Sequence, residues 1–348
     1  MVPKRDPQSR VGFVVQCALP SSCDSYILSA LLEDGDCPST DIINDTFDRF
    51  GPTPRICLET ASDPGNLHAY EVDVVEALDE MTLQRLQDLT TMTKKLAMDK
   101  LSQKFCLVRR KDVDNVKSDR LVSPITEYIR SEIASRMQFC SMEQQVKAFL
   151  LFYLNDTSRA MSGTVFENIF HLRFRRHISI RFMPMVRSDR RRNLKWHASH
   201  CAIDASILYA QELEEKRQIA LLDCVDFDVE PASFFVYDRL AFPLEQNVYY
   251  VPKKLNEATF DSFILQRGLL YLFQFTVSPK HDINDALITR FQDCADVPTP
   301  DNWRYIFIIP NDKTVFNCPY PTKSHELRKL TPFSSQVPVD YDSLVAPA

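Results

Sequence analysis

The sequence predicts an α/β protein in which a mainly helical first part precedes a layered α/β/α core. Residues 1 to about 155 carry helical, amphipathic patterns. After Gly163 the helix-like and strand-like runs alternate, which is typical of layered α/β domains. Only six glycines occur among 348 residues, and neither G-x-x-x-x-G-K-[ST] nor G-x-G-x-x-G is present. This absence argues against nucleotide binding by the chain alone.

Three helices are predicted in the first part. One lies within Tyr70–Lys100, where valines and leucines recur at a spacing of three to five residues. Another opens at Ser123-Pro124, because proline is favoured at the first helical position. A third begins at Ser141, where Ser-Met-Glu-Gln offers a capping box. The polar segment Asn155–Gly163 then marks the predicted domain boundary, which gives a first domain of residues 1–155.

Residues 156–320 are predicted to form the α/β/α core. Two apolar strands joined by Gln-Arg-Gly have the spacing of a hairpin. The predicted elements, in order, are a helix at Thr164–Arg175, a strand at His177–Val186, a helix at Ala205–Arg217, strands at Thr259–Leu265 and Leu269–Val277, a helix at Asp282–Asp296 and a strand at Trp303–Pro310. Residues 321–348 are rich in proline and serine and are predicted to be an irregular tail.

Composition favours an intracellular protein, nuclear or cytoplasmic. No apolar run reaches the roughly 18 residues of a membrane span, so no membrane association is expected. The first residues lack the pattern of a secretion signal. Ten cysteines occur without C-x-x-C pairs, which indicates reduced, mostly buried thiols rather than a zinc ribbon.

A basic segment stands out in this acidic chain. Residues His171–His197 hold nine Arg and Lys against the single acid Asp189, a net charge of +8, which leaves −14 for the rest of the chain. Such a segment is either a solvated loop or a surface for phosphate groups. As candidate nucleic-acid contacts we take Arg173, Arg175, Arg176, Arg190, Arg191, Arg192 and Lys195.

A set of oxygen-bearing side chains gives a candidate metal site. Glu167 lies in an apolar helix, Asp261 lies on the first hairpin strand, and Gln274 lies on the second. The period of two places Gln274 and Thr276 on one face of their strand, where Asp261 can lie across from Gln274. Phosphodiester hydrolysis needs an activated water and charge neutralisation, which Mg²⁺ or Mn²⁺ held by carboxylates supplies.

Three sequence segments between residues 249 and 281 are similar to segments of a known protein family. Tyr-Tyr-Val-Pro (249–252), Ala-Thr-Phe-Asp-Ser-Phe (258–263) and Leu-Phe-Gln-Phe-Thr-Val-Ser-Pro-Lys-His (272–281) resemble the C-terminal nuclease-like domain of Crinkler and retrotransposon-hot-spot-type proteins. That domain is similar to the PD-(D/E)XK restriction-endonuclease superfamily. Phe-Asp-Arg-Phe-Gly-Pro-Thr-Pro-Arg (47–55), ending in Arg55, resembles the end of the ATPase module that precedes it. Residues 1–155 then look like the tail of that module, without its phosphate-binding loop.

The resemblance implies a restriction-endonuclease-like fold, DNA as the partner, and a metal-dependent endonuclease if the site is active. Glu167, Asp261 and Gln274 then correspond to the metal-site residues, with Mg²⁺ or Mn²⁺ as cofactor. The usual Glu/Asp-x-Lys is replaced here by Gln274-x-Thr276. An amide is a weaker ligand than a carboxylate, and threonine supplies no cation. Lys280 or His281 would have to substitute for the lysine.

Two further interpretations remain open. The fold can be a catalytically inactive nuclease scaffold that serves in interaction, regulation or nucleic-acid binding. The individual side chains also have structural explanations: Glu167 can close a capping box with Thr164, Gln274 and Thr276 can be a satisfied polar pair, and His281 can belong to a helix start. His197, His200 and Cys201 have a spacing that suits a metal, but a fourth ligand is missing nearby.

Overall fold

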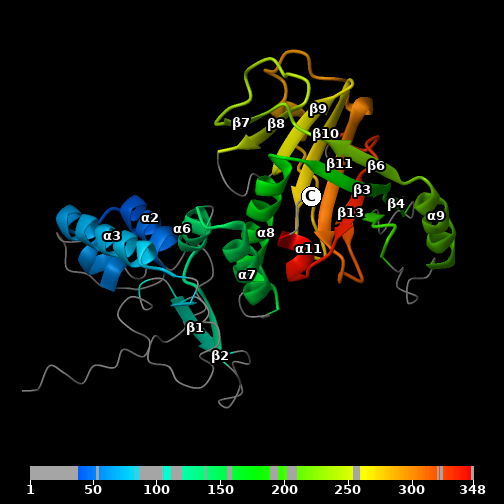
Figure 1. Ribbon diagram of the computed structural model, residues 1–348. Coiled ribbons are helices and arrows are strands. Elements are labelled where there is room, and N and C mark those ends of the chain that lie inside the picture. Colours follow the sequence, from blue (N-terminus) through cyan, green and yellow to red (C-terminus); the bar gives the residue numbers. More distant parts are fainter. Residues whose placement is uncertain are drawn as a thin grey trace, which may run out of the picture. The chain divides into compact units, whose positions relative to one another are not determined.

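The computed structural model describes residues 38–51, 55–82, 84–85, 104, 106–110, 120–137, 139–154, 159–188, 195–201, 210–253, 259–319, 321 and 324–345. The chain divides into two compact units (Figure 1). The first comprises residues 1–81 and 92–130, and the second comprises residues 82–91 and 131–348. The division therefore lies before the predicted boundary at residue 155.

The first unit contains strands as well as helices. Its elements are α2 (Thr40–Phe50), the π-helical turn η1 (Arg55–Thr60), α3 (Pro64–Asp79), and the antiparallel pair β1 (Cys106–Arg110) and β2 (Arg120–Pro124). Ser39 caps α2, and Asp63 caps α3 with proline at its first turn. The expectation of a mainly helical domain thus misses a two-stranded sheet. Residues 52–54 of the motif before Arg55, and residues 86–100 of the predicted first helix, lie outside the described residues.

The predicted helix at Ser123-Pro124 begins later than expected. Pro124 ends β2, and α6 spans Glu127–Met137. The hydroxyl of Thr126 accepts the N–H of Ile129 at 3.1 Å, which is the contact of a helix cap. The helix start is therefore set by Thr126 rather than by proline.

Two helices open the second unit. In α7 (Met142–Tyr153) the predicted capping box is present, because Ser141 and Gln144 exchange side chain-to-backbone hydrogen bonds. The next helix, α8, spans Arg159–Phe174 and so begins before the predicted Thr164. Phe149 of α7 lies 5.3 Å from Phe166 of α8, measured between ring centroids. Packing against α7 explains why the polar stretch after residue 159 is helical rather than a linker.

The second unit is built on an eight-stranded mixed sheet (Figure 1). Across the sheet the order is β6-β3-β13-β11-β10-β9-β8-β7, and three neighbouring pairs are parallel: β7/β8, β10/β11 and β11/β13. The strands are β3 (Ile178–Pro184), β6 (Val225–Val229), β7 (Ser233–Tyr237), β8 (Val248–Pro252), β9 (Ser262–Gln266), β10 (Leu269–Phe275), β11 (Trp303–Pro310) and β13 (Phe333–Val337).

The remaining elements are short. A three-stranded sheet contains β4 (Val186–Arg187), β5 (Lys195–His197) and β12 (Asn317–Pro319). The helices are α9 (Ala210–Leu222), α10 (Leu287–Arg290), the 3₁₀ turn η2 (Pro300–Asn302) and α11 (Tyr341–Val345). The predicted irregular tail therefore contains both a strand and a helix. Among the described helices, none has the length and apolar character needed to cross a bilayer.

The predicted hairpin between β9 and β10 is confirmed. Its turn residues Arg267 and Gly268 have φ values of 50° and 76°, the left-handed conformations of a two-residue hairpin turn. The register pairs Leu270 with Leu265 and Phe273 with Ser262. Asp261, directly before β9, consequently lies across from Gln274.

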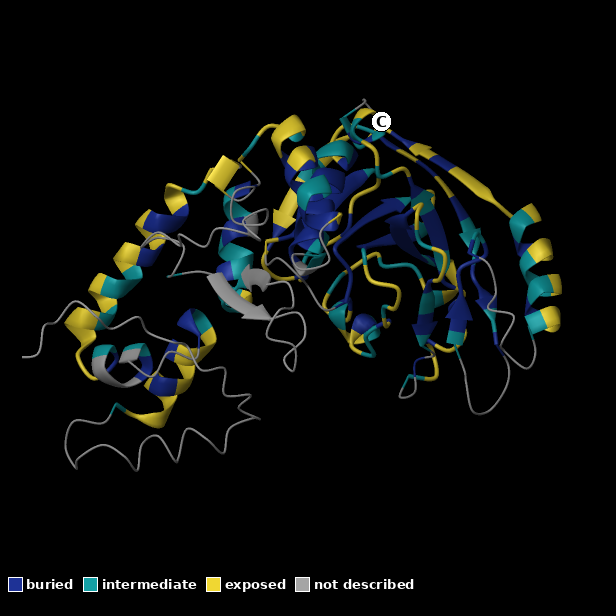
Figure 2. Ribbon diagram, turned by 90° about the horizontal axis from the view of Figure 1, so that it is seen from below, coloured by how far each residue is buried: buried dark blue, intermediate teal, exposed yellow. Residues whose placement is uncertain are grey.

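The two faces of the sheet are covered differently. On one face, α8 packs Phe170 and Phe174 against Phe273 and Phe275. On the other, Leu272, Tyr305 and Phe307 join a large core cluster with residues from loops and short helices. Figure 2 shows buried residues concentrated in the sheet and in α8. The mixed α/β class is thus confirmed.

The helix predicted at Asp282–Asp296 is reduced to the single turn of α10. One side chain takes up a backbone donor in place of a helical carbonyl, since Asn284 Oδ1 accepts the N–H of Ala286 at 2.9 Å. Asp285 Oδ1 instead accepts the N–H of Ser324, outside the predicted helix, at 3.2 Å. Asn and Asp often compete with helix formation in this way.

Candidate functional site

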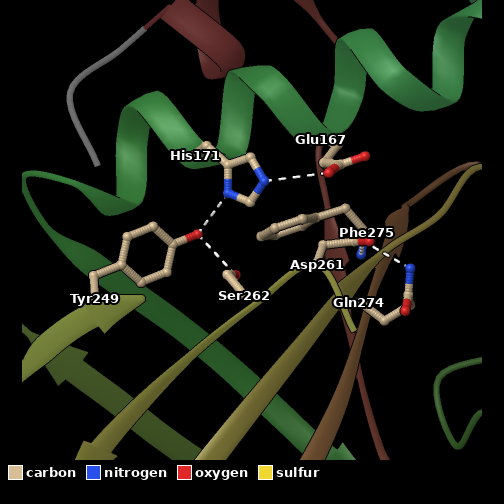
Figure 3. A network of polar contacts seen from close by, with 7 residues as sticks. All are labelled: Glu167, His171, Tyr249, Asp261, Ser262, Gln274 and Phe275. Atoms are coloured by element: carbon tan, nitrogen blue, oxygen red, sulfur yellow. Dashed lines mark hydrogen bonds and ion pairs between the residues drawn. The ribbon is translucent and has the colours of Figure 1, made fainter. Parts of the chain in front are cut away.

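The three predicted metal-site residues lie in the region where α8 crosses the sheet (Figure 3). Glu167 is in the middle of α8, Asp261 directly precedes β9, and Gln274 is in β10. Their exposed fractions are 5%, 2% and 4%. Each side chain is therefore shielded from solvent and depends on the polar partners that the fold provides.

Asp261 and Gln274 form the hydrogen-bonded pair that the hairpin register predicts. Asp261 Oδ2 accepts Gln274 Nε2 at 2.7 Å and the backbone N–H of Phe275 at 2.6 Å. The Tyr305 hydroxyl lies 3.2 Å from Gln274 Oε1, but its single proton has the Thr259 carbonyl as its closer acceptor, at 2.7 Å. The Gln274 amide is thus held mainly through its nitrogen. Its oxygen, the atom that a metal ion would need, faces Tyr305.

Glu167 approaches from the opposite face of the sheet to that of Gln274. Phe273 and Phe275 contact α8, and side chains alternate between faces along a strand. Gln274, between them, therefore points to the face of Tyr305. In Figure 3 the side chain of Phe275 lies below Glu167 and His171 and above the Asp261–Gln274 pair.

Glu167 belongs to a second polar network. His171, one turn further along α8, has Nε2 at 3.4 Å from Glu167 Oε1 and Nδ1 at 2.8 Å from the Tyr249 hydroxyl. Tyr249 in turn donates to Ser262 Oγ at 2.8 Å. Since the tyrosine proton goes to Ser262, the Nδ1–H of His171 donates to Tyr249 and Nε2 accepts from a protonated Glu167. Four side chains from three elements thus form one hydrogen-bonded chain.

The protonation of this network follows from its burial. Burial raises the pKa of Glu167 to about 8. Burial, together with the charge of Arg175, lowers the pKa of His171 to about 3. A neutral carboxyl group beside a neutral imidazole agrees with the donor order derived from the geometry. The position of Glu167 well inside α8 also excludes the capping-box explanation, because the helix begins at Arg159.

The Glu167–His171 pair predicts a specific dependence of stability on pH. The raised pKa of Glu167 contributes stability that is present below its ordinary 4.5 and is lost as the pH rises towards 8. The lowered pKa of His171 contributes stability that is present above 6.5 and is lost as the pH falls towards 3. Between pH 4.5 and 6.5 the two contributions change stability in opposite directions and cancel. From pH 6.5 to 8 only Glu167 should still lower the stability, by roughly 2 kcal/mol in all.

Urea unfolding followed by tryptophan fluorescence measures this decline, because both tryptophans, Trp196 and Trp303, are buried in the second unit. In Glu167→Gln the decline between pH 6.5 and 8 should be absent, since the amide does not titrate. If stability fell equally with pH in the variant and in the wild type, Glu167 could not be the group that titrates.

The other predicted site residues have local partners. Thr276 Oγ1 accepts the N–H of Ser278 at 3.1 Å, which holds the turn after β10. Lys280 is exposed. The Nδ1–H of His281 donates to the carbonyl of Asp282 at 3.0 Å, and its ring lies 5.9 Å from that of Phe307. The assistance of Lys280 or His281 at the site stays a prediction.

The predicted basic surface is partly structural. Arg173 Nη1 donates to the carbonyl of Ser343 at 3.2 Å, and the guanidinium of Arg175 lies 3.9 Å from the ring centroid of Phe234. Burial lowers the pKa of both arginines. Arg176 is exposed and Lys195 half-buried, whereas Arg190, Arg191 and Arg192 lie outside the described residues.

The donor set does not fit a Mg²⁺ or Mn²⁺ ion well. Such ions take oxygen ligands and usually keep several waters, but here Glu167 lies on the opposite face of the sheet from Gln274, and Asp261 Oδ2 already accepts two hydrogen bonds. Among the residues with assigned positions, no cluster of three or more His, Cys, Asp or Glu has an arrangement suited to a metal. This includes His197, His200 and Cys201.

No protein-family model, curated protein or solved structure matches the chain. The site is therefore defined by its own geometry. Sequence reasoning paired Asp261 with Gln274 but missed His171, Tyr249, Ser262 and Tyr305. The pairing of His171 with Glu167 could have been predicted, because residues four apart on a helix share one face. No sequence pattern predicted the contact of Tyr249 with His171, since the two lie 78 positions apart.

Proposed function

We propose that the second unit is a nuclease-like module of the Crinkler and retrotransposon-hot-spot type that is directed to DNA and binds it without cleaving it. The observation that carries this proposal is the Gln274 side chain. The resemblance gives it the position of a metal-binding residue, yet it is a neutral amide whose nitrogen donates to the Asp261 carboxylate at 2.7 Å. A residue committed in this way stabilises the hairpin instead of holding a catalytic ion.

The order of elements supports the relation to nucleases. The helix α8 carries the glutamate, β8, β9 and β10 form an antiparallel meander, and β11 adds parallel to β10 after a crossover. This is the arrangement in which the sequence resemblance expects a glutamate, an aspartate and a polar pair. The scaffold is thus compatible with that origin, while its polar groups are engaged with one another.

Binding to DNA would rely on phosphate contacts rather than on chemistry. Arg175 and Arg176 directly follow α8 and are exposed, and the basic segment continues in the sequence towards residue 195. Affinity for a double-stranded fragment, measured by fluorescence anisotropy, should fall steeply as salt rises, because phosphate contacts release counterions. Arg176→Ala should weaken binding and reduce the slope, whereas Arg239→Ala, an exposed arginine on the loop after β7, should leave both unchanged. Undetectable binding, or a flat salt response, would remove this proposal.

The absence of cleavage is tested separately. Calorimetric titration with MgCl₂ and MnCl₂ should show no specific uptake, and plasmid DNA should remain intact in the presence of either ion. A second candidate, a metal-dependent endonuclease, is favoured by one observation: the Tyr249 hydroxyl contacts both His171, the partner of Glu167, and Ser262, the residue next to Asp261, so the two carboxyl-bearing residues belong to one region. Mn²⁺ uptake together with nicking that is lost in Asp261→Asn would establish that candidate instead.

A further inference from the structure

Arg175, which directly follows α8, has a guanidinium without a charged partner. The residue is exposed, and within the described ranges its guanidinium has neither a carboxylate nor a hydrogen-bond acceptor. Several arginines elsewhere on the described surface are paired with acids instead, in the ion pairs Arg49–Glu71, Arg181–Asp226, Arg217–Glu214 and Arg239–Asp293. The positive charge and the N–H groups of Arg175 are therefore available to a ligand.

The position of this guanidinium is fixed by aromatic rings beneath it. It lies 3.9 Å from the ring centroid of Phe234, the distance of a stacked contact. Phe234 is paired across the sheet with Tyr249, and their ring centroids are 6.2 Å apart. The Tyr249 hydroxyl is in turn held by His171 and Ser262. A series of planar groups thus leads from the buried polar network to the surface, where the guanidinium is its last member.

The exposed side of Arg175 suits two parts of a nucleotide. Because Phe234 covers one face of the guanidinium and the residue is exposed, the accessible parts are the other face and the N–H edges. Guanidinium faces stack on nucleic-acid bases, and guanidinium edges bind phosphate through two parallel hydrogen bonds. In a duplex each base is already stacked between its neighbours, so the face of the guanidinium can be reached only by an unpaired base.

We propose that Arg175 is a stacking subsite for an unpaired base, so that the preferred ligand of this module is single-stranded or locally unpaired DNA. This inference rests on the proposed DNA binding and narrows its ligand class. Phe234 and Tyr249 act as positioning residues, because they hold the guanidinium in one place. The exposed Arg176 beside it supplies a second positive charge for a neighbouring phosphate. Recognition of the charged backbone alone would need no guanidinium fixed on an aromatic ring.

Fluorescence anisotropy of the full chain with three labelled DNA probes tests this proposal. The probes are an oligodeoxyadenylate of about 12 nucleotides, the same backbone with abasic residues in place of the adenines, and a duplex of equal length. The single strand should bind at least about fivefold more tightly than the abasic strand, which carries the same charge but has no bases to stack. It should also bind more tightly than the duplex, although phosphate contacts alone would favour the higher charge density of the duplex.

Two lysine substitutions assign the preference to Arg175. Arg175→Lys keeps the charge but removes the planar group, so the advantage of the single strand over the abasic strand should disappear. The matched control Arg176→Lys, at the next exposed position, should keep that advantage within twofold, and circular dichroism checks that both variants are folded. Equal binding of the adenylate and abasic strands, or a preference that survives Arg175→Lys, would overturn the subsite while leaving duplex binding in place. A chain that binds none of the three probes would overturn the proposed DNA binding itself, and the subsite with it.

Discussion

The full chain carrying Phe174→Ala should lose about 3 to 5 kcal/mol of stability in its second unit, the largest effect expected of a single substitution here. Phe174 ends α8 with 2% of its surface exposed. Its ring lies 5.3 Å from Phe273, 5.6 Å from Phe275 and 6.0 Å from Tyr249. Truncation would open a cavity between the helix and the sheet that these rings cannot fill, because the polar network beside them fixes Tyr249.

The measurement is the urea midpoint and slope from tryptophan fluorescence. Phe139→Ala provides the matched control, since Phe139 is in the same unit but 89% exposed, and its loss should change stability by less than about 0.5 kcal/mol. Equal effects of the two substitutions would show that α8 does not pack on the sheet as described.

Asp261→Ala should destabilise the second unit by about 2 to 4 kcal/mol. The carboxylate accepts hydrogen bonds from the Gln274 amide and the Phe275 N–H, and the variant would leave both donors buried without these bonds. Each unsatisfied buried donor costs about 1 to 3 kcal/mol. Asp261→Asn keeps an acceptor oxygen and should cost less, which makes it the better variant for any test of activity.

The control for this prediction is Asp238→Ala. Asp238 Oδ2 lies 3.5 Å from Lys253 Nζ on the surface. Exposed ion pairs of this kind contribute at most about 1 kcal/mol to stability. If Asp261→Ala were as mild as Asp238→Ala, the Asp261–Gln274 pair could not be a main structural feature of the hairpin. The structural interpretation of Gln274 would then fail, and its role in a metal site would regain support.

The hairpin and its polar pair were predictable because they depend on local rules. The alternation of side chains along a strand predicted the face on which Gln274 lies. The Gln-Arg-Gly turn predicted the register that places Asp261 opposite Gln274. The β13 strand was not predictable in the same way. Ser334 and Ser335 are buried at its centre, so the segment lacks the apolar pattern of a buried strand. The sheet neighbours, rather than the segment itself, make it a strand.

The sequence predicted which residues form the candidate site but not which hydrogen bonds they make. Sequence patterns named Glu167, Asp261 and Gln274, but which hydrogen bonds each makes depends on tertiary partners. The Tyr249 hydroxyl contacts His171, the partner of Glu167, and the Tyr305 hydroxyl lies 3.2 Å from the amide oxygen of Gln274. Both tyrosines come from distant strands. The contacts of the basic side chains could not be predicted either. Arg175, for example, stacks on Phe234, which lies 59 positions later in the sequence.

The placement of β13 has a consequence for how the chain is made. This strand is the last of the sheet in chain order, yet it lies between β11 and β3. A nascent polypeptide on the ribosome therefore holds two incomplete half-sheets until residue 337 has emerged. Their open strands would be exposed to chaperones and to aggregation during that interval. Stalled chains that end before Phe333 should accordingly be digested by protease more readily than chains that extend past Val337.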